Sequence, residues 1–141
     1  MNIGYNLMVL EYMIRDRFHK PGGVLKQFGI APGLTVVDYG CGPGRYIEAA
    51  ASLVGEAGLI YAADISETGI RCVKKRIVKN GLKNVTPVLL EPSNITIPDG
   101  CADVVYALDM FHRVDDPAQF LKDIRRIGIC FTLKTDISPG R

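Results

Sequence analysis

Short apolar runs alternate with helical segments through most of this sequence, and that alternation limits the fold more than any other feature. The run LTVVD is rich in β-branched residues and apolar on both alternating faces, as expected of a strand covered on both sides in a parallel sheet. Strands separated by helices indicate right-handed crossovers between parallel neighbours. The sequence therefore predicts a doubly wound α/β fold with a mostly parallel sheet of four to five strands. The strands are expected at 34–38, 59–64, 85–90 and 103–108, with 129–133 as the fifth, and the intervening helices at 47–54, 66–79 and 117–127.

The whole chain, 1–141, is expected to form a single domain. Its length is close to the roughly 150 residues of an average domain, and 48% apolar residues supply the material for an ordinary core. Ahead of the first strand we predict an amphipathic helix over 7–18, interrupted at Pro21-Gly22-Gly23, and a short helix over 24–29 that ends at Gly29. In chain order, the N-terminal helices cover about 1–30, the central α/β core about 34–127 and an atypical tail 128–141.

Charge and cysteine content exclude several classes of partner. Seventeen Lys and Arg against fifteen Asp and Glu give a net charge of +2, so we expect no nucleic-acid partner. No apolar run approaches the roughly 18 residues needed to cross a bilayer, so we expect no membrane partner. The four cysteines include no CxxC pair, which predicts no metal site and reduced, mostly buried thiols. These features predict a soluble, cytoplasmic protein.

The segment VVDYGCGPGRY carries the strongest functional signal. Asp38 ends the first predicted strand, and Gly40, Gly42 and Gly44 follow before a helix. Ligands of open α/β sheets lie outside the carboxyl ends of the strands, where glycines let a ligand approach the backbone closely. A dinucleotide fingerprint would need its third glycine at Arg45, and a P-loop would need a Gly-Lys-Ser/Thr ending. The loop therefore indicates a nucleoside cofactor without a phosphate at this point.

A second carboxylate sharpens this prediction. Asp64 ends the second predicted strand, twenty positions after Gly44, where a carboxylate can accept hydrogen bonds from both ribose hydroxyls of a nucleoside. Two acids flanking a glycine loop suit a cationic cofactor that carries hydroxyl groups. Asp64 alone would be equally consistent with an acid on the surface at the end of a strand.

Together these motifs resemble the class I S-adenosylmethionine-dependent methyltransferases. The resemblance rests on the DxGxGxG loop, on the acid ending the second strand and on the later segment DGCADVVYALDMFHRVDDP, and it covers about 20–127. It is closest to the small-molecule, methyltransferase type 11-like members. The resemblance implies a Rossmann-like sheet, S-adenosyl-L-methionine as cofactor, S-adenosyl-L-homocysteine as product and a small molecule as methyl acceptor.

The resemblance also implies roles for individual residues. The backbone of Tyr39–Gly44, including Cys41, would line the methionine part of the cofactor, and Asp38 would hold its ammonium group. Asp64 would bind the ribose, and Ile65 would pack on the adenine. Where the family usually has an Asp-Ala pair near the adenine amino group, this chain has Pro92-Ser93. The remaining implied contacts are Ser93 or Asn94 to the adenine and the Ala107 carbonyl to the methionine amino group.

No catalytic residue follows from the sequence. Methyl transfer is an in-line displacement that can depend largely on proximity and orientation. Asp109 and His112 follow the fourth strand and are either a base or substrate contact, or polar groups that end a loop or cap a helix. Cys41 is interpreted as a small side chain chosen for fit, with a nucleophile as the alternative. The basic helix at 66–79 is interpreted as a solvated face, with RNA contact as the alternative.

The tail departs from the family pattern. The resemblance predicts a closing antiparallel hairpin, but the chain reads GICFTLKTDISPGR and stops. We therefore expect a sheet without that hairpin and an exposed edge that favours self-association, such as a homodimer. A natural or experimental truncation, or a shifted reading frame, would account for the tail. Two functions stay open: a methyltransferase, or a cofactor-binding but catalytically incomplete fragment or subunit that a partner completes.

Overall fold

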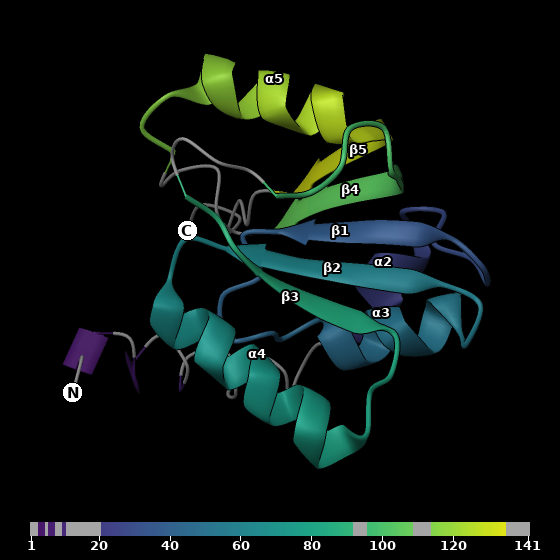
Figure 1. The fold of residues 1–141 in the computed structure, drawn as a ribbon, viewed down its shortest axis with the longest axis vertical. Coiled ribbons are helices and arrows are strands. Elements are labelled where there is room, and N and C mark those ends of the chain that lie inside the picture. Colours follow the sequence, from purple (N-terminus) through teal and green to yellow (C-terminus); the bar gives the residue numbers. More distant parts are fainter. Residues whose placement is uncertain are drawn as a thin grey trace, which may run out of the picture.

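The computed structural model describes residues 3, 4, 6, 7, 10, 21–91, 96–108 and 114–134. Its strands form one sheet in the order β3-β2-β1-β4-β5, and every pairing is parallel. The predicted α/β class and strand count are confirmed (Figure 1). In chain order the labelled elements are α2 (Pro21–Lys26), β1 (Thr35–Tyr39), α3 (Ile47–Val54), β2 (Leu59–Asp64), α4 (Glu67–Asn80), β3 (Val85–Leu89), β4 (Ala102–Leu108), α5 (Pro117–Ile127) and β5 (Gly128–Lys134).

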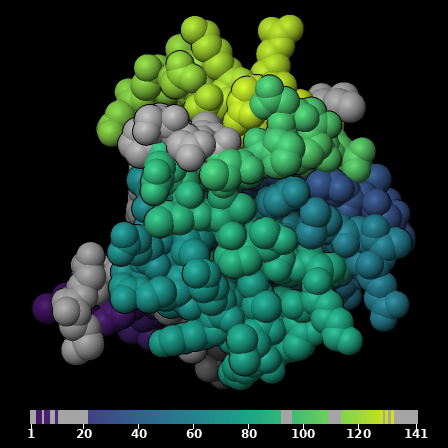
Figure 2. Space-filling model, in the orientation of Figure 1, coloured from purple at the N-terminus to yellow at the C-terminus, as the bar shows by residue number. Residues whose placement is uncertain are grey.

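Helices cover both faces of the sheet. Helices α2, α3 and α4 lie on one face and α5 on the other, as Figure 1 shows. In the space-filling view α5 forms the upper layer and α4 the lower layer of the visible side (Figure 2). Alternate residues of β1, β2, β3 and β4 supply two apolar clusters, so Val36 of β1 packs under α3 while Val37 packs towards α5. Burial on both faces explains why the strands are apolar at consecutive positions.

Two helices carry the capping chemistry that their sequences predict. The Ser66 hydroxyl accepts a hydrogen bond from the Gly69 N–H at the start of α4, and Gly81 ends that helix in the left-handed conformation. The Asp116 carboxylate accepts a hydrogen bond from the Gln119 N–H at the start of α5. These caps fix the helix ends beside the strands that the helices follow.

The structure corrects the predicted N-terminal region. Pro21-Gly22-Gly23 was expected to interrupt a helix, but these residues form the first turn of α2, which ends at Lys26, before the expected Gly29. Proline suits the first turn of a helix because the N–H groups there have no partner within the helix. Residues 3, 4, 6, 7 and 10 are helical, and the rest of the predicted helix over 7–18 lies outside the described residues.

The thiols are free but less buried than expected. Cys41 is buried, Cys72 and Cys101 are half-buried, and Cys130 is exposed. The prediction of mostly buried thiols is therefore wrong. Cys130 is exposed because β5 is at the edge of the sheet. Within the described part of the chain, no helix has the length and apolar character needed to cross a membrane.

Candidate functional site

The glycine loop joins β1 to α3 at the carboxyl edge of the sheet. Gly40, Gly42 and Gly44 all have positive φ, at 84°, 54° and 86°, a conformation that other residues adopt at a cost. The backbone N–H groups of Gly40 and Cys41 both donate to the Ala63 carbonyl, at 2.7 and 2.9 Å. The end of β2 therefore holds the first half of the loop in place.

The glycines of the loop serve different purposes. A Cβ on Gly44 would lie 3.1 Å from both Ile47 Cδ1 and Val73 Cγ2, so this glycine lets α3 and α4 pack together. A Cβ on Gly42 would meet nothing within 4 Å. Gly42 thus borders open space, which is where a ligand can approach the backbone.

Asp64 ties the loop to the end of β2. Its Oδ2 atom accepts a hydrogen bond from the Gly42 N–H at 2.7 Å, and its Oδ1 atom accepts one from the Ser66 N–H at 2.8 Å. The carboxylate is half-buried. Because each carboxylate oxygen has two acceptor sites, Asp64 can hold the loop and still accept hydroxyl hydrogens from a nucleoside.

Asp38 lies beneath the same loop. Its residue is only 2% exposed, and its Oδ2 atom has no hydrogen-bond partner among the described residues. Burial, together with the nearby charge of Asp64, raises the pKa of Asp38 from 3.8 to about 7, although the Tyr106 hydroxyl opposes this rise. Near neutral pH this carboxyl group is therefore poised between its two charge states.

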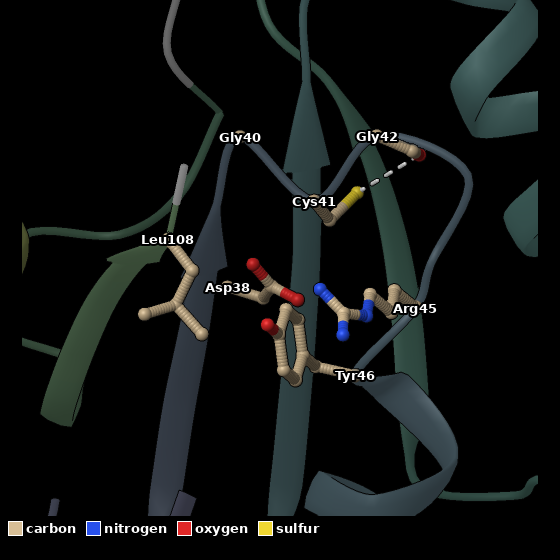
Figure 3. Close-up of a pocket in the computed structure, with 7 residues that line it drawn as sticks. All are labelled: Asp38, Gly40, Cys41, Gly42, Arg45, Tyr46 and Leu108. Atoms are coloured by element: carbon tan, nitrogen blue, oxygen red, sulfur yellow. Dashed lines mark hydrogen bonds between the residues drawn. The ribbon is translucent and has the colours of Figure 1, made fainter. Parts of the chain in front are cut away.

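A small cavity of about 20 Å³ opens beside Asp38. Figure 3 shows the side chains of Asp38, Arg45, Tyr46 and Leu108 gathered beneath the loop. The cavity has room for roughly one water molecule, so a nucleoside would have to lie above the loop. Exposed groups border that side: Gly42 faces open space, and Ile65 is 77% exposed.

Cys41 is not a reactive thiol. Its side chain is buried and lies 3.6 Å from the Gly42 carbonyl oxygen (Figure 3). Burial, then the charges of Asp38 and Asp64, raise the pKa of the thiol well above its usual value. Since the thiolate is the nucleophilic form, this placement supports a small side chain chosen for fit.

The structure brings together part of the predicted site. Asp38, the glycine loop, Asp64 and Ile65 lie at one edge of the sheet, at the ends of neighbouring strands β1 and β2. The Tyr39 side chain points to the opposite face and packs against Phe120, with ring centroids 5.4 Å apart, so only its backbone can line this site. Ala107 is buried on β4, one residue before Leu108, which lines the cavity, and the contact from its carbonyl stays a prediction. Ser93, Asn94, Asp109 and His112 lie outside the described residues.

Four residues of this region were not singled out as site residues. Arg45 and Tyr46 line the cavity, and the Arg45 guanidinium carbon lies 5.0 Å from the centre of the Tyr46 ring. Leu108 of β4 lines the cavity. Tyr106, also on β4, lies beside Asp38 of β1. A polar hydroxyl two residues before the end of the fourth strand was the one available signal, but its place beside Asp38 follows only from the pairing of β1 with β4.

These residues fit a cationic nucleoside cofactor. The carboxyl oxygen of Asp38 that has no partner among the described residues can receive a cationic group, and the Asp64 oxygens retain capacity for hydroxyl donors. The open side of Gly42 gives the close backbone approach that such a ligand requires. The parallel sheet with this loop and acid defines a Rossmann-like nucleoside-binding domain.

Comparison with known proteins identifies the family. Residues 37–129 match the family described as "Methyltransferase domain". A crystal structure of a SAM dependent methyltransferase from Aquifex aeolicus superposes with a TM-score of 0.79 and 31% identity, covering 89% of this chain and 71% of that one. The chain therefore belongs to the methyltransferase-domain family, within the class I S-adenosylmethionine-dependent methyltransferases.

Curated relatives match over a shorter part of their own length. The ubiquinone/menaquinone biosynthesis C-methyltransferase UbiE of Hydrogenovibrio crunogenus is 31% identical over 100 residues, which is 70% of this chain and 39% of that protein. Nocamycin O-methyltransferase of Saccharothrix syringae is 34% identical over 76 residues, 54% of this chain and 27% of that protein. The chain thus spans less than half the length of these two relatives.

Proposed function

We propose that this protein binds S-adenosyl-L-methionine at the carboxyl edge of its sheet and transfers the methyl group to a small molecule, leaving S-adenosyl-L-homocysteine. One observation carries the proposal. The Asp64 carboxylate accepts a hydrogen bond from the Gly42 N–H and lies beside the open space that Gly42 borders. The buried carboxyl group of Asp38 and the family match over 37–129 support it.

The residues of this chain would act mainly by binding and orienting. Asp64 would receive the ribose hydroxyls, and Ile65 would offer an apolar surface to the adenine. Asp38 would receive the cationic amino group of the cofactor at the small cavity beneath the loop. The cofactor would supply a methyl group on a positively charged sulfur: an acceptor nucleophile would bond to the methyl carbon in line as the carbon–sulfur bond breaks, and the sulfur would leave as the neutral thioether of S-adenosylhomocysteine. Proximity and alignment can provide most of the acceleration in such a step.

The relatives indicate a chemical class for the methyl acceptor. The relatives include a C-methyltransferase of quinone biosynthesis and an O-methyltransferase, so both carbon and oxygen acceptors occur among similar proteins. We propose a small molecule, and the first acceptors to test are a naphthoquinol and a phenol. Transfer of tritium from methyl-labelled S-adenosylmethionine to either one by the purified chain would establish the activity.

The rival function is a domain that binds the cofactor without completing the reaction. The chain covers 39% of the UbiE relative, and an assay for methyl transfer decides between the two functions. Methyl transfer to any acceptor by the purified chain would exclude the rival function. Binding of S-adenosylhomocysteine without transfer to any acceptor of a broad panel would instead support it.

Calorimetric titration with S-adenosylhomocysteine tests the binding site. Asp64→Ala removes acceptors for both the ribose and the Gly42 N–H, so we expect the affinity to fall roughly 10- to 100-fold, as for loss of hydrogen bonds to a charged group. Asp103→Ala is the matched control. The Asp103 carboxylate also accepts a backbone hydrogen bond, from the Thr35 N–H, but at the end of the strands opposite to the glycine loop. Equal affinity of wild type and Asp64→Ala would refute the assignment.

We also propose a second copy of this chain as a partner and the cytoplasm as the location. Strand β5 is at one edge of the sheet, and within the described part of the chain no strand pairs with its outer side. Exposed strand edges favour pairing with another strand. The cytoplasmic location is supported by four free thiols, which a reducing compartment maintains.

A further inference from the structure

A second buried polar group lies beside the Asp38 carboxylate. Tyr106 of β4 is the direct neighbour of Asp38 of β1 in the parallel register, and paired residues of adjacent strands point to the same face. Tyr106 is fully buried. Its hydroxyl oxygen and Asp38 Oδ2 are the two buried side-chain polar atoms without a hydrogen-bond partner among the described residues. The two groups without partners are therefore neighbours in the structure.

Packing explains the Tyr106 ring but not its hydroxyl. The ring centroid lies 6.0 Å from that of Phe28 and 6.4 Å from that of Tyr46, in an aromatic group under the sheet. A phenylalanine would make the same ring contacts. A buried hydroxyl without a partner costs about 1 to 3 kcal/mol, and the acceptor within its reach is the Asp38 carboxylate, whose pKa the Tyr106 hydroxyl lowers as a hydrogen-bond partner.

Among the groups around Asp38, the Tyr106 hydroxyl is the neutral group that can donate a hydrogen bond to its carboxylate. Asp64 at the end of β2 disfavours a negative charge on Asp38, and burial does so more strongly. The Tyr106 hydroxyl acts in the opposite direction, since it lowers the pKa of Asp38. Among the described residues, the ionisable or charged groups around Asp38 are Tyr106 from β4, Asp64 from β2, and Cys41, Arg45 and Tyr46 from the loop that leads into α3.

We infer that Tyr106 is a positioning residue for cofactor binding: its hydroxyl donates a hydrogen bond to the ionised Asp38 carboxylate and holds it for the cationic amino group of the cofactor. This inference rests on the proposed function. In the ligand-free protein near pH 7, burial keeps the carboxyl group neutral in about half of the molecules. Binding of the cation ionises it and gives the Tyr106 hydroxyl its acceptor. Cofactor binding is then coupled to release of a proton, so affinity rises with pH.

The test compares wild type with Tyr106→Phe, which keeps the ring and removes the hydroxyl. Carbon-13 NMR of labelled aspartate, with Asp38→Asn for assignment, follows the carboxyl group in the ligand-free protein. We expect Asp38 to titrate near pH 7 in the wild type. In Tyr106→Phe its acid dissociation constant should fall about tenfold, as for loss of a hydrogen bond to a charged group. An unchanged titration would overturn the inference.

Calorimetry with S-adenosylhomocysteine gives the second measurement. Near pH 7 we expect Tyr106→Phe to bind about tenfold more weakly, with the rise in affinity moved to higher pH. A loss of affinity that is equal at every pH would indicate a structural role only and contradict the inference. If wild type binds no S-adenosylhomocysteine at any pH, the proposed function fails, while the NMR titration still decides whether the Tyr106 and Asp38 pair exists.

Two further variants complete the design. Tyr61→Phe is the matched control, because Tyr61 of β2 is a partly buried tyrosine that packs on the opposite face of the sheet; it should leave the Asp38 titration unchanged. If Tyr106→Phe does not fold, 3-fluorotyrosine at position 106 replaces it. Its more acidic hydroxyl is a stronger donor and should move the Asp38 titration to lower pH. No movement would again overturn the inference.

Discussion

At the scale of single residues, the buried carboxyl group of Asp38 lowers the stability of the fold as pH rises. An acid whose pKa is higher in the folded than in the unfolded protein binds more protons when folded, so ionising it destabilises the fold. With values of 3.8 unfolded and about 7 folded, this contribution is most favourable below pH 4. It is lost progressively as pH rises to 7 and stays constant above that. The site therefore keeps a buried carboxylate whose ionisation destabilises the fold, and a bound cation can offset that loss of stability.

Asp38→Asn tests this cost directly. Without a titrating group at position 38, the variant should gain roughly 2 to 3 kcal/mol relative to wild type between pH 5 and pH 8. Urea unfolding of both proteins at the two pH values measures this gain, and S-adenosylhomocysteine affinity should fall in the same variant. If the difference in unfolding free energy between the two proteins did not change with pH, Asp38 would not titrate in this range.

Gly42 and Gly44 form a matched pair for separating stability from binding. Gly44→Ala should cost about 2 to 4 kcal/mol, because it adds left-handed strain and crowds Ile47 and Val73 at 3.1 Å. Gly42→Ala carries strain without crowding and should cost about 1 to 2 kcal/mol. Calorimetry should show the larger loss of cofactor affinity for Gly42→Ala, whose new methyl group enters the open side. The reverse order in unfolding experiments would contradict these assignments.

At the scale of elements, close packing at the junction of α5 and β5 depends on Gly128. The strand begins directly after the helix, and a Cβ on Gly128 would lie 2.5 Å from Val105 Cγ2 and 3.3 Å from Ala102 Cβ on β4. Gly128→Ala should destabilise the protein by about 1 to 3 kcal/mol through overpacking. Gly23→Ala in α2, where a Cβ meets nothing within 4 Å, should stabilise it by about 0.5 to 1 kcal/mol. Thermal unfolding of the two variants would show opposite shifts.

The same scale explains which elements could be predicted. The bounds of α3 and β2, 47–54 and 59–64, match the prediction residue by residue, because the turn from Gly55 to Gly58 separates the two apolar runs. Capping residues predicted the starts of α4 and α5 equally well. The first turn of α2 was mispredicted because proline and glycine interrupt helices at most positions but are tolerated at the N-terminus.

The candidate site could be predicted only in part for a related reason. The glycine loop and the two acids are adjacent to strand ends, so local sequence identifies them. Tyr106 lies in β4, where every other residue except Asp103 is apolar, and an aromatic residue there indicates core packing. Its place beside Asp38 depends on the order of the sheet, in which β4 lies next to β1 although more than sixty residues separate the paired positions. Such neighbours emerge only when the strand order is known.

At the scale of the whole molecule, the two edges of the sheet differ in their capacity to pair. Pro87 lies in the edge strand β3 and cannot donate a backbone hydrogen bond. Strand β5 contains no proline, and Lys134 is its one charged residue. Two copies of β5 can therefore align around a twofold axis with little charge repulsion, which makes this edge the expected contact between copies.

Sedimentation velocity under reducing conditions tests the second copy. We expect a concentration-dependent monomer–dimer equilibrium for wild type. Cys130→Lys places a charge on the exposed side chain of β5 and should weaken the dimer, because like charges on facing strands repel. Ser52→Lys adds the same charge on the exposed surface of α3 and should leave the equilibrium unchanged. A wild type that stays monomeric at every concentration, or equal weakening by both substitutions, would show that β5 does not pair with a second copy.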